Sequence, residues 1–443
     1  MGRTDRTGAG SGVVGGAVVA GAIAVMNVTT YGLTLASARV LGPDQFGQFS
    51  SVLGALIVVN VVSLALQATG ARRVSTTPGD RHRIERTILR ATAVCALGVT
   101  AVTLLATPLV TSGLRLDSPT GAVAMAVAAG FLTLMGGQAG ILQGEQRWLH
   151  LAAVYAAMGI ARLAAGGLAL LVDRSAAAAL VGVAVGAAVP VVVAGLVLRH
   201  PARTRTRPPV GAEPAESWRT WERGGIAREV VHSAHALLAF FAVSNIDVLL
   251  ARGLLEAVPA GHYAAGLVLT KAMLFLPQFV VIVLFPAMAR SRGGRRTHLL
   301  GLGAILGLGV VAALAVALLS GLALAFVGGA AYEPVESSLP LFAALGTVLA
   351  MVQLLVYSAL AQRHPRAVVS LWVALAVTAA LSPLADSARE LLVIKLGVDA
   401  ALLVVLAVHL LVVTPREAET PVPPVVEPAI AEDTSSPEQP AVR

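Results

Sequence analysis

A few ionisable side chains interrupt the long apolar stretches of this 443-residue chain, and they are its candidates for chemistry. Arg162 lies halfway along the apolar stretch 151–172, with no acid within four residues on either side. Such an arginine has no local partner, and its planar guanidinium suits the bidentate binding of a phosphate or pyrophosphate. We therefore expect Arg162 to bind a substrate anion; the alternative is an ion pair with an acid on another helix.

Lys271, in the apolar stretch 262–286, is the second candidate for anion binding, and Asp247, in the stretch 226–252, is its expected neighbour. If both stretches are helices, the depths of the two groups differ by roughly 6 Å, which a lysine side chain can span. The pair is either structural or a switch that opens when an anion binds Lys271 or when Asp247 is protonated. Glu229 precedes Asp247 by eighteen residues, or five helical turns, so both carboxylates share a face and are candidates for ion coupling.

Lys395 and Asp399 are four residues apart, so they share one face of a helix and can neutralise each other. This spacing favours a structural pair, although Lys395 is also a candidate for anion binding and Asp399 for ion coupling. Arg39 directly follows the stretch 13–38, and Arg252 ends the stretch 226–252. We expect both to anchor helix ends, and both are further candidates for contact with a departing anion.

The apolar composition of the chain predicts which secondary-structure elements position these residues. Hydrophobic residues make up 56% of the sequence and charged residues 13%, with a mean hydropathy of +0.81. Soluble proteins have about 45–50% apolar and about 25% charged residues, so the bilayer must be the solvent here. Long apolar runs without alternation predict helices rather than a β-barrel. Twelve stretches are long enough to span a membrane: 13–38, 48–70, 87–111, 120–143, 151–172, 176–198, 226–252, 262–286, 298–327, 337–361, 367–385 and 391–413.

The basic residues predict how these helices are oriented. Of the 32 lysines and arginines, 24 lie in the amino terminus, the even-numbered connections and the tail, and five lie in the odd-numbered connections. This alternation predicts a multi-pass protein of the cytoplasmic membrane with both termini in the cytoplasm. The net charge of +8 thus reflects the topology, and the basic residues would attract anionic lipid headgroups. We expect no nucleic-acid binding.

Several classes of site are excluded or disfavoured by the residues present. One cysteine, Cys95, rules out an internal disulfide and a cysteine-based zinc cluster, and neither lysine follows a glycine-rich phosphate loop. His232 and His235 have a suitable spacing for a metal, but no third ligand converges with them, so we expect no metal and no cofactor. The odd-numbered connections span about ten residues or fewer, which leaves little room for an active site, and we expect no enzyme activity.

The chain divides into two halves of six helices, with an internal repeat. A basic, proline-rich linker, 199–225, separates the bundle 1–198 from the bundle 226–413, and an acidic, proline-rich tail, 414–443, is predicted to be disordered. Segments 35–50 and 249–264 align at an offset of 214 residues, and the aligned pairs are Leu41 with Leu255, Gly47 with Gly261 and Phe49 with Tyr263. Since six is even, both copies enter the membrane in the same direction, related by an axis along the membrane normal.

Two of these segments resemble a known family. Residues 36–50, ASARVLGPDQFGQFS, resemble the first loop of polysaccharide and oligosaccharide flippases of the multidrug/oligosaccharidyl-lipid/polysaccharide (MOP) exporter superfamily. Residues 244–289, with SNIDVLLARGLLEAVPAGHYAAG followed by LPQFVVIVLFPAMA, are similar to the region of helices 7 and 8 in that family. Gly253 and Glu256-Ala257-Val258 depart from the family pattern at the second turn. The resemblance implies an all-α fold of two pseudo-symmetric six-helix bundles around a central cavity.

The resemblance also implies an activity and its partners. The protein would flip a polyprenyl-linked oligosaccharide from the cytoplasmic to the outer leaflet by alternating access, in contact with membrane lipid and with glycan polymerase or glycosyltransferases as partners. A multidrug exporter of the same superfamily is the alternative, although organic cations call for acids and aromatic surfaces, and aromatic residues make up only 4% of this chain. A polytopic membrane enzyme of glycan assembly is a weaker alternative.

Overall fold

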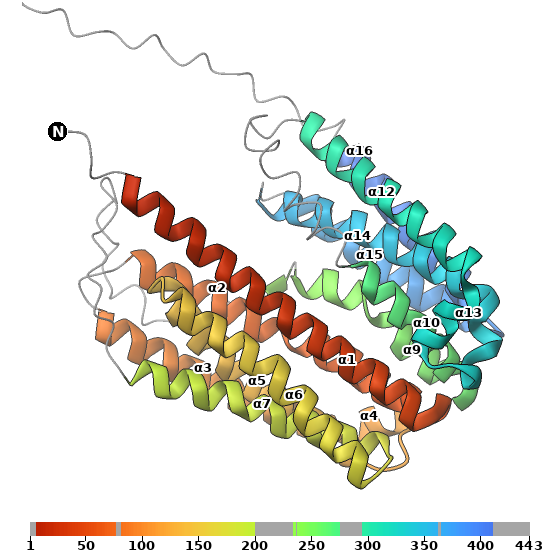
Figure 1. Cartoon of the computed structure of the whole chain (residues 1–443), viewed down its shortest axis with the longest axis horizontal. Coiled ribbons are helices and arrows are strands. Elements are labelled where there is room, and N and C mark those ends of the chain that lie inside the picture. Colours follow the sequence, from red (N-terminus) through yellow and green to blue (C-terminus); the bar gives the residue numbers. More distant parts are fainter. Residues whose placement is uncertain are drawn as a thin grey trace, which may run out of the picture.

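The computed structural model describes residues 6–76, 81–199, 234–235, 237–274, 295–361 and 365–410, and these contain helices and no strand. Figure 1 shows the helices in two groups that converge at one end of the molecule. Nine of the described helices are long and apolar enough to cross a membrane, or ten if the bent pair Leu237–Val243 and Ile246–Leu254 is one span. The predicted all-α, polytopic fold class is confirmed.

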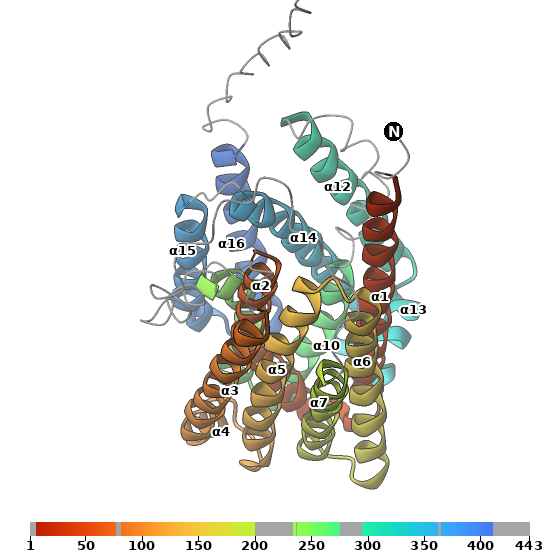
Figure 2. The ribbon, with the colours of Figure 1, turned by 90° about the vertical axis from the view of Figure 1, so that its left-hand side faces the viewer.

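The first group, here called the N-lobe, runs from α1 to α7. Its helices lie side by side in Figure 2. They are α1 (Arg6–Val59), α2 (Val61–Thr76), α3 (Arg81–Leu105), α4 (Thr107–Gly113), α5 (Thr120–Gly144), α6 (Trp148–Val172) and α7 (Ala176–Leu198).

The second group, here called the C-lobe, begins with the short helix Leu237–Val243. It continues with α9 (Ile246–Leu254), α10 (Ala257–Met273), α12 (Arg295–Leu318), α13 (Ser320–Val327), the 3-10 helix Ala330–Ser338, α14 (Leu339–Ala361), α15 (Pro365–Leu381), the 3-10 turn Ser382–Leu384 and α16 (Ala388–Val408). The predicted linker 199–225, apart from its first residue, and the predicted tail 414–443 lie outside the described residues.

Helix α1 is broken at Gly42, and it contains the predicted span 13–38 and the first half of the predicted span 48–70, which continues in α2. The backbone of Gly42 has φ 69° and ψ 173°, a conformation that glycine adopts without steric cost. Pro43 follows and disfavours helical geometry in the residue before it. The two segments of α1, 6–41 and 43–59, therefore line opposite sides of the same cavity, described below.

The two lobes meet where the sequence repeat predicted equivalent positions. A methyl group placed on Gly47 of α1 would lie 3.1 Å from the Cα of Gly261 of α10, and one on Gly261 would overlap the carbonyl oxygen of Pro43. The two glycines of the repeat thus face each other across the lobe interface, as expected if the symmetry axis passes between them. We call this part of the molecule the closed end.

Replacing Gly261 with alanine should destabilise the closed end, because the added methyl group meets backbone that cannot move aside. Overpacking of this kind costs about 1–3 kcal/mol. Gly303→Ala is the matched control, since the space around Gly303 in α12 is open and alanine favours a helix. Thermal unfolding of the purified protein should show a lower midpoint for Gly261→Ala than for Gly303→Ala. Equal midpoints would contradict the close approach of the two backbones.

Candidate functional site

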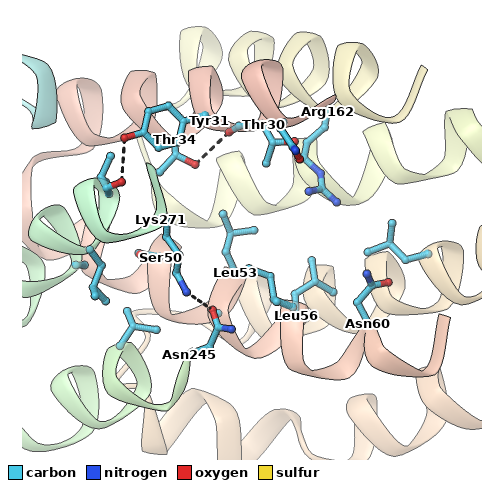
Figure 3. Close-up of a pocket in the computed structure, with 18 of the residues that line it drawn as sticks. Thr30, Tyr31, Thr34, Ser50, Leu53, Leu56, Asn60, Arg162, Asn245 and Lys271 are labelled. Carbon is cyan, nitrogen blue, oxygen red and sulfur yellow. Dashed lines mark hydrogen bonds between the residues drawn. The ribbon is translucent and has the colours of Figure 1, made fainter. Parts of the chain in front are cut away.

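A central cavity of about 240 Å³ lies between the two lobes. It is lined by both segments of α1, by α5 and α6 of the N-lobe, and by Asn245, α9 and α10 of the C-lobe (Figure 3). Two cations, Arg162 and Lys271, line this cavity, and no aspartate or glutamate is among its lining residues in the described part of the chain. The net charge of the described cavity lining is therefore positive.

Arg162 projects from α6 into this cavity (Figure 3). Close packing fixes the helix that carries it, because a methyl group on Gly186 of α7 would lie only 2.7 Å from the Cα of Arg162. Its Nε atom is buried without a hydrogen-bond partner, and within the described residues the guanidinium forms no ion pair. The alternative prediction, a structural pair with an acid on another helix, is wrong for the part of the chain that is described. Arg162 is instead available to a ligand.

Lys271, in α10, lines the side of the cavity opposite Arg162. There it stabilises a break between two helices. Helices Leu237–Val243 and α9 meet at a bend of 42°. The Nζ atom of Lys271 donates to the Ser244 carbonyl oxygen at 2.7 Å and to Oδ1 of Asn245 at 2.9 Å, at this bend. An ammonium group has three donors, so Lys271 can satisfy the broken helix and still offer one donor to a ligand.

The predicted ion pair between Asp247 and Lys271 is wrong. Asp247 is buried, accepts a hydrogen bond from Tyr263 Oη at 3.3 Å and accepts another from the Val248 amide at 3.0 Å. The break between the two helices explains why Lys271 does not pair with Asp247. It frees the Ser244 carbonyl oxygen and turns Asn245 towards Lys271, so the hydrogen bonds of the ammonium group go to these two residues. Asp247 does not line the central cavity, and its role in ion coupling stays a prediction.

Lys395 and Asp399 form the pair that their spacing predicted. The Nζ atom lies 2.6 Å from Oδ1 and 2.5 Å from Oδ2 of the carboxylate, and both side chains are fully buried in α16. Neither residue lines the central cavity. The proposed anion-binding role of Lys395 is therefore not supported by its position, because both oxygens of Asp399 already occupy its ammonium group.

Breaking this pair should destabilise the protein, whereas replacing both partners should not. Lys395→Met alone leaves a buried, unpaired carboxylate, which costs about 3–5 kcal/mol. The double variant Lys395→Met with Asp399→Leu removes both charges and should recover most of the loss, because a buried pair and apolar residues of similar size are often equivalent. Thermal unfolding of the purified variants measures both effects. A single variant as stable as the wild type, or a double variant less stable than Lys395→Met, would contradict a structural role.

The remaining predicted site residues lie elsewhere. Arg39 is exposed near the closed end, where its Nη2 donates to the Ala325 carbonyl oxygen of α13 at 3.0 Å. It does not line the central cavity, so it is a contact between lobes rather than part of the central site. Glu229 and His232 lie outside the described residues. His235 accepts a hydrogen bond from Trp372 Nε1 at 3.0 Å, and no cluster of three metal-ligating side chains occurs among the residues described.

Neutral polar residues also line the cavity, together with apolar ones such as Leu53, Leu56 and Met158. From the sequence alone, polar residues within apolar stretches are candidates for contact with sugar hydroxyls, namely Asn27, Thr30, Gln67, Gln138, Gln143 and Gln353. Asn27 and Thr30 line this cavity, and the four glutamines do not. The sequence interpretation missed several others, although a lone asparagine within an apolar stretch is a visible signal for two of them. The missed polar lining residues are Tyr31, Thr34, Ser50, Asn60 and Asn245.

Two arginines join the lobes at the closed end, each by hydrogen bonds to the other lobe. Arg252 of α9 is buried, and it donates through Nε to the Leu114 carbonyl oxygen at 2.9 Å and through Nη2 to the Arg115 carbonyl oxygen at 2.8 Å. Its Nη1 lies 2.7 Å from Oδ1 of Asp44. Arg115 reaches in the opposite direction and donates to the carbonyl oxygens of Gly253 and Leu255. Each guanidinium thus binds backbone carbonyls of the other lobe.

Tyrosine hydroxyls add two further contacts between the lobes. Tyr332 donates to the Ala38 carbonyl oxygen at 2.8 Å near the closed end, and Tyr31, which lines the central cavity, donates to the Val268 carbonyl oxygen at 2.9 Å. Tyr31 therefore joins the two lobes at the wall of the central cavity.

Comparison with known proteins rests on the fold. No family model and no curated protein sequence matches this chain. Among solved structures, it is similar to an inward-facing multidrug resistance MATE family transporter of the MOP superfamily (TM-score 0.64, 10% identity, 85% of this chain and 92% of that one). It is also similar to the lipid II flippase MurJ in an inward closed conformation (TM-score 0.65, 8% identity, 87% of each chain). The chain therefore shares its fold with these two transporters. The chain is also similar to an outward-facing multidrug resistance MATE family transporter (TM-score 0.51, 10% identity, 88% of this chain and 93% of that one).

Proposed function

We propose that this protein is a transporter that moves a lipid-linked oligosaccharide across the membrane by alternating access of the central cavity. The observation that supports this most is the charge of the cavity lining: Arg162 and Lys271 are present, and no carboxylate is among the described lining residues. A headgroup that carries a phosphate or diphosphate would balance this charge.

The chemistry of Arg162 supports an anionic headgroup. Arg162 is half-buried and its Nε is buried without a partner, which is costly. A ligand that supplies phosphate oxygens would reduce that cost through two parallel, charge-assisted hydrogen bonds. Lys271 lies on the other lobe and adds a third donor, so one anion can contact both lobes at once. An anion held in this way would couple binding to movement of the lobes.

The neutral polar lining supports a glycan attached to that anion. Amides and hydroxyls of Asn27, Thr30, Ser50 and Asn60 offer both donors and acceptors, as sugar hydroxyls require. The cavity of about 240 Å³ has room for part of a headgroup and not for a polyprenyl chain, so the chain would remain in the bilayer. The distribution of basic residues predicts cytoplasmic termini. In the proposed function the glycolipid moves from the cytoplasmic to the outer leaflet.

A multidrug exporter is the competing function, since several similar folds belong to MATE transporters. Organic cations are bound by carboxylates and aromatic faces. Tyr31 is the one aromatic residue in the described lining of the cavity, and both of its charged residues are cations. The cavity is therefore better suited to an anionic ligand than to an organic cation.

The test is transport by the full-length protein in proteoliposomes. A fluorescent polyprenyl-diphosphate oligosaccharide in the inner leaflet should become accessible to a membrane-impermeant glycosidase outside, faster than in liposomes without protein. An organic cationic dye is the parallel substrate. Glycolipid movement without dye movement supports the proposal, whereas dye movement alone assigns the protein to drug export. Movement of neither would overturn both functions.

A further inference from the structure

Helix α3 exposes one face along its length at the edge of the N-lobe (Figure 2). Its other side is buried, and Ile88, Thr92 and Ala96 are at most 5% exposed. That side packs on α5, since a methyl group placed on Gly137 would overlap Thr92. The exposed residues recur at intervals of three and four, which places them in one row on the helix. This row, here called the α3 face, consists of Arg83, Arg86, Arg90, Val94, Leu97, Ala101 and Leu105.

The α3 face changes from basic to apolar at one point along the helix. Its arginines, from Arg83 to Arg90, lie at the end of α3 remote from the closed end. Beyond them the face is apolar, and Val94, Leu97 and Leu105 are 70%, 71% and 82% exposed. The helix rises about 16 Å from Val94 to Leu105, which is about half the thickness of a hydrocarbon core of about 30 Å. The apolar part therefore matches the acyl chains of one leaflet, with the arginines at headgroup depth.

Two arginines of the α3 face carry charges that no described residue neutralises. Arg86 and Arg90 are exposed, and neither has an ion pair or a hydrogen bond within the described part of the chain. They are four residues apart, so two like charges are neighbours on the helix surface, which is unfavourable without a counter-ion. Glu85, the one acid of α3, is half-buried and lies on a different face. An anion from outside the described chain would relieve this repulsion.

We propose that the α3 face binds an anionic phospholipid of the surrounding bilayer, with its phosphate between Arg86 and Arg90 and an acyl chain along the apolar part of the face. A guanidinium binds phosphate oxygens through parallel, charge-assisted hydrogen bonds, so two neighbouring arginines suit a phosphodiester. A lipid without net charge would cover the apolar part equally well but leave both arginines uncompensated. A soluble phosphate would compensate the arginines but leave the apolar part uncovered.

A second copy of the chain is the other occupant that an exposed apolar helix face can take. A two-fold interface brings the same surface patch of both copies together. Both copies have the same orientation in a membrane, so arginines at the same depth would meet, and their like charges repel. The charge of the face therefore favours an anionic lipid. This inference is independent of the proposed function, because the α3 face shares no residue with the lining of the central cavity.

Native mass spectrometry of the full-length protein, released from detergent micelles, measures lipid binding directly. Titrations would compare phosphatidylglycerol, phosphatidylcholine with the same acyl chains, and soluble glycerol 3-phosphate. We expect phosphatidylglycerol to bind most tightly. Arg86→Ala combined with Arg90→Ala should weaken its binding about 25-fold, because each arginine near a lipid headgroup contributes about fivefold. Arg86→Lys combined with Arg90→Lys should bind it more tightly than the alanine variant does, because both charges remain.

Arg174→Ala combined with Arg389→Ala is the matched control, because it removes two exposed arginines that lie outside α3. This variant should bind phosphatidylglycerol as the wild type does. Equal affinities for the two phospholipids, or an alanine variant of α3 that binds as tightly as the control, would overturn the inference. Tight binding of glycerol 3-phosphate would replace the lipid by a soluble phosphate, and a dimer that only the α3 substitutions change would assign the face to a second copy. Either result would also overturn the inference.

Discussion

Arg162→Ala should reduce glycolipid transport by about 100-fold or more while the protein still folds and reaches the membrane. The variant removes two charge-assisted hydrogen bonds to the anion, each worth about 1.5–3 kcal/mol. Folding should not suffer, because no hydrogen bond or ion pair within the described chain depends on this guanidinium. The transport rate in proteoliposomes, normalised to the amount of protein inserted, measures the effect.

Arg162→Lys and Arg199→Ala serve as controls for this experiment. Lysine keeps the charge but loses the bidentate geometry, so partial transport is expected. Arg199 follows α7 and is exposed, and its loss changes surface charge without changing the cavity. If Arg162→Ala transports at the wild-type rate, or if Arg199→Ala is equally impaired, the guanidinium has no specific part in transport.

Arg252→Ala combined with Arg115→Ala should open the closed end. The two side chains make four hydrogen bonds to carbonyl oxygens of the opposite lobe. The two from the buried Arg252 are each worth about 1.5–3 kcal/mol, whereas the two from Arg115, which is exposed, contribute less. The pair with Asp44 should add less, since that carboxylate is 40% exposed and solvent screens it. The equilibrium between lobe arrangements should therefore shift towards the opposite one.

Distances between spin labels can follow this shift. Cys95 is the single native cysteine, so Cys95→Ser provides a background for labels at Arg174 of the N-lobe and Glu333 of the C-lobe. Pulsed electron paramagnetic resonance should show a longer distance in the double variant than in the parent. Arg389→Ala, at an exposed arginine beginning α16, should leave the distance unchanged. Unchanged distances in the double variant would show that the arginines do not hold the closed end.

Much of this architecture could be predicted from the sequence. The apolar runs predicted the helices. The internal repeat aligned Gly47 with Gly261, and in the structure these two equivalent positions face each other. Arg162 was a candidate from the sequence because no acid accompanies it in its helix, a property of one segment alone. The structure places it at the central cavity, and its role in binding stays a prediction. Lys395 and Asp399 were predictable for the same local reason, since their spacing of four residues brings them together.

The errors came from features that depend on two segments at once. The hydrogen bonds of Lys271 could not be predicted, because apolar periodicity does not reveal the bend between residues 243 and 246. Arg115 was missed because its role depends on a connection whose backbone has a φ of 46° and directs the side chain to the other lobe. Contacts of this kind follow from the packing of the lobes, which no single helix specifies.

Binding of ligands that share a tail and differ in headgroup charge tests the central claim most directly. Calorimetric titration of the purified full-length protein would compare geranylgeranyl diphosphate, geranylgeraniol and a quaternary ammonium compound with the same tail. A cavity that selects anions through Arg162 should bind the diphosphate at least about tenfold more tightly than the alcohol, and Arg162→Gln should remove the difference. Equal affinities for all three ligands, or tighter binding of the ammonium compound, would contradict the account.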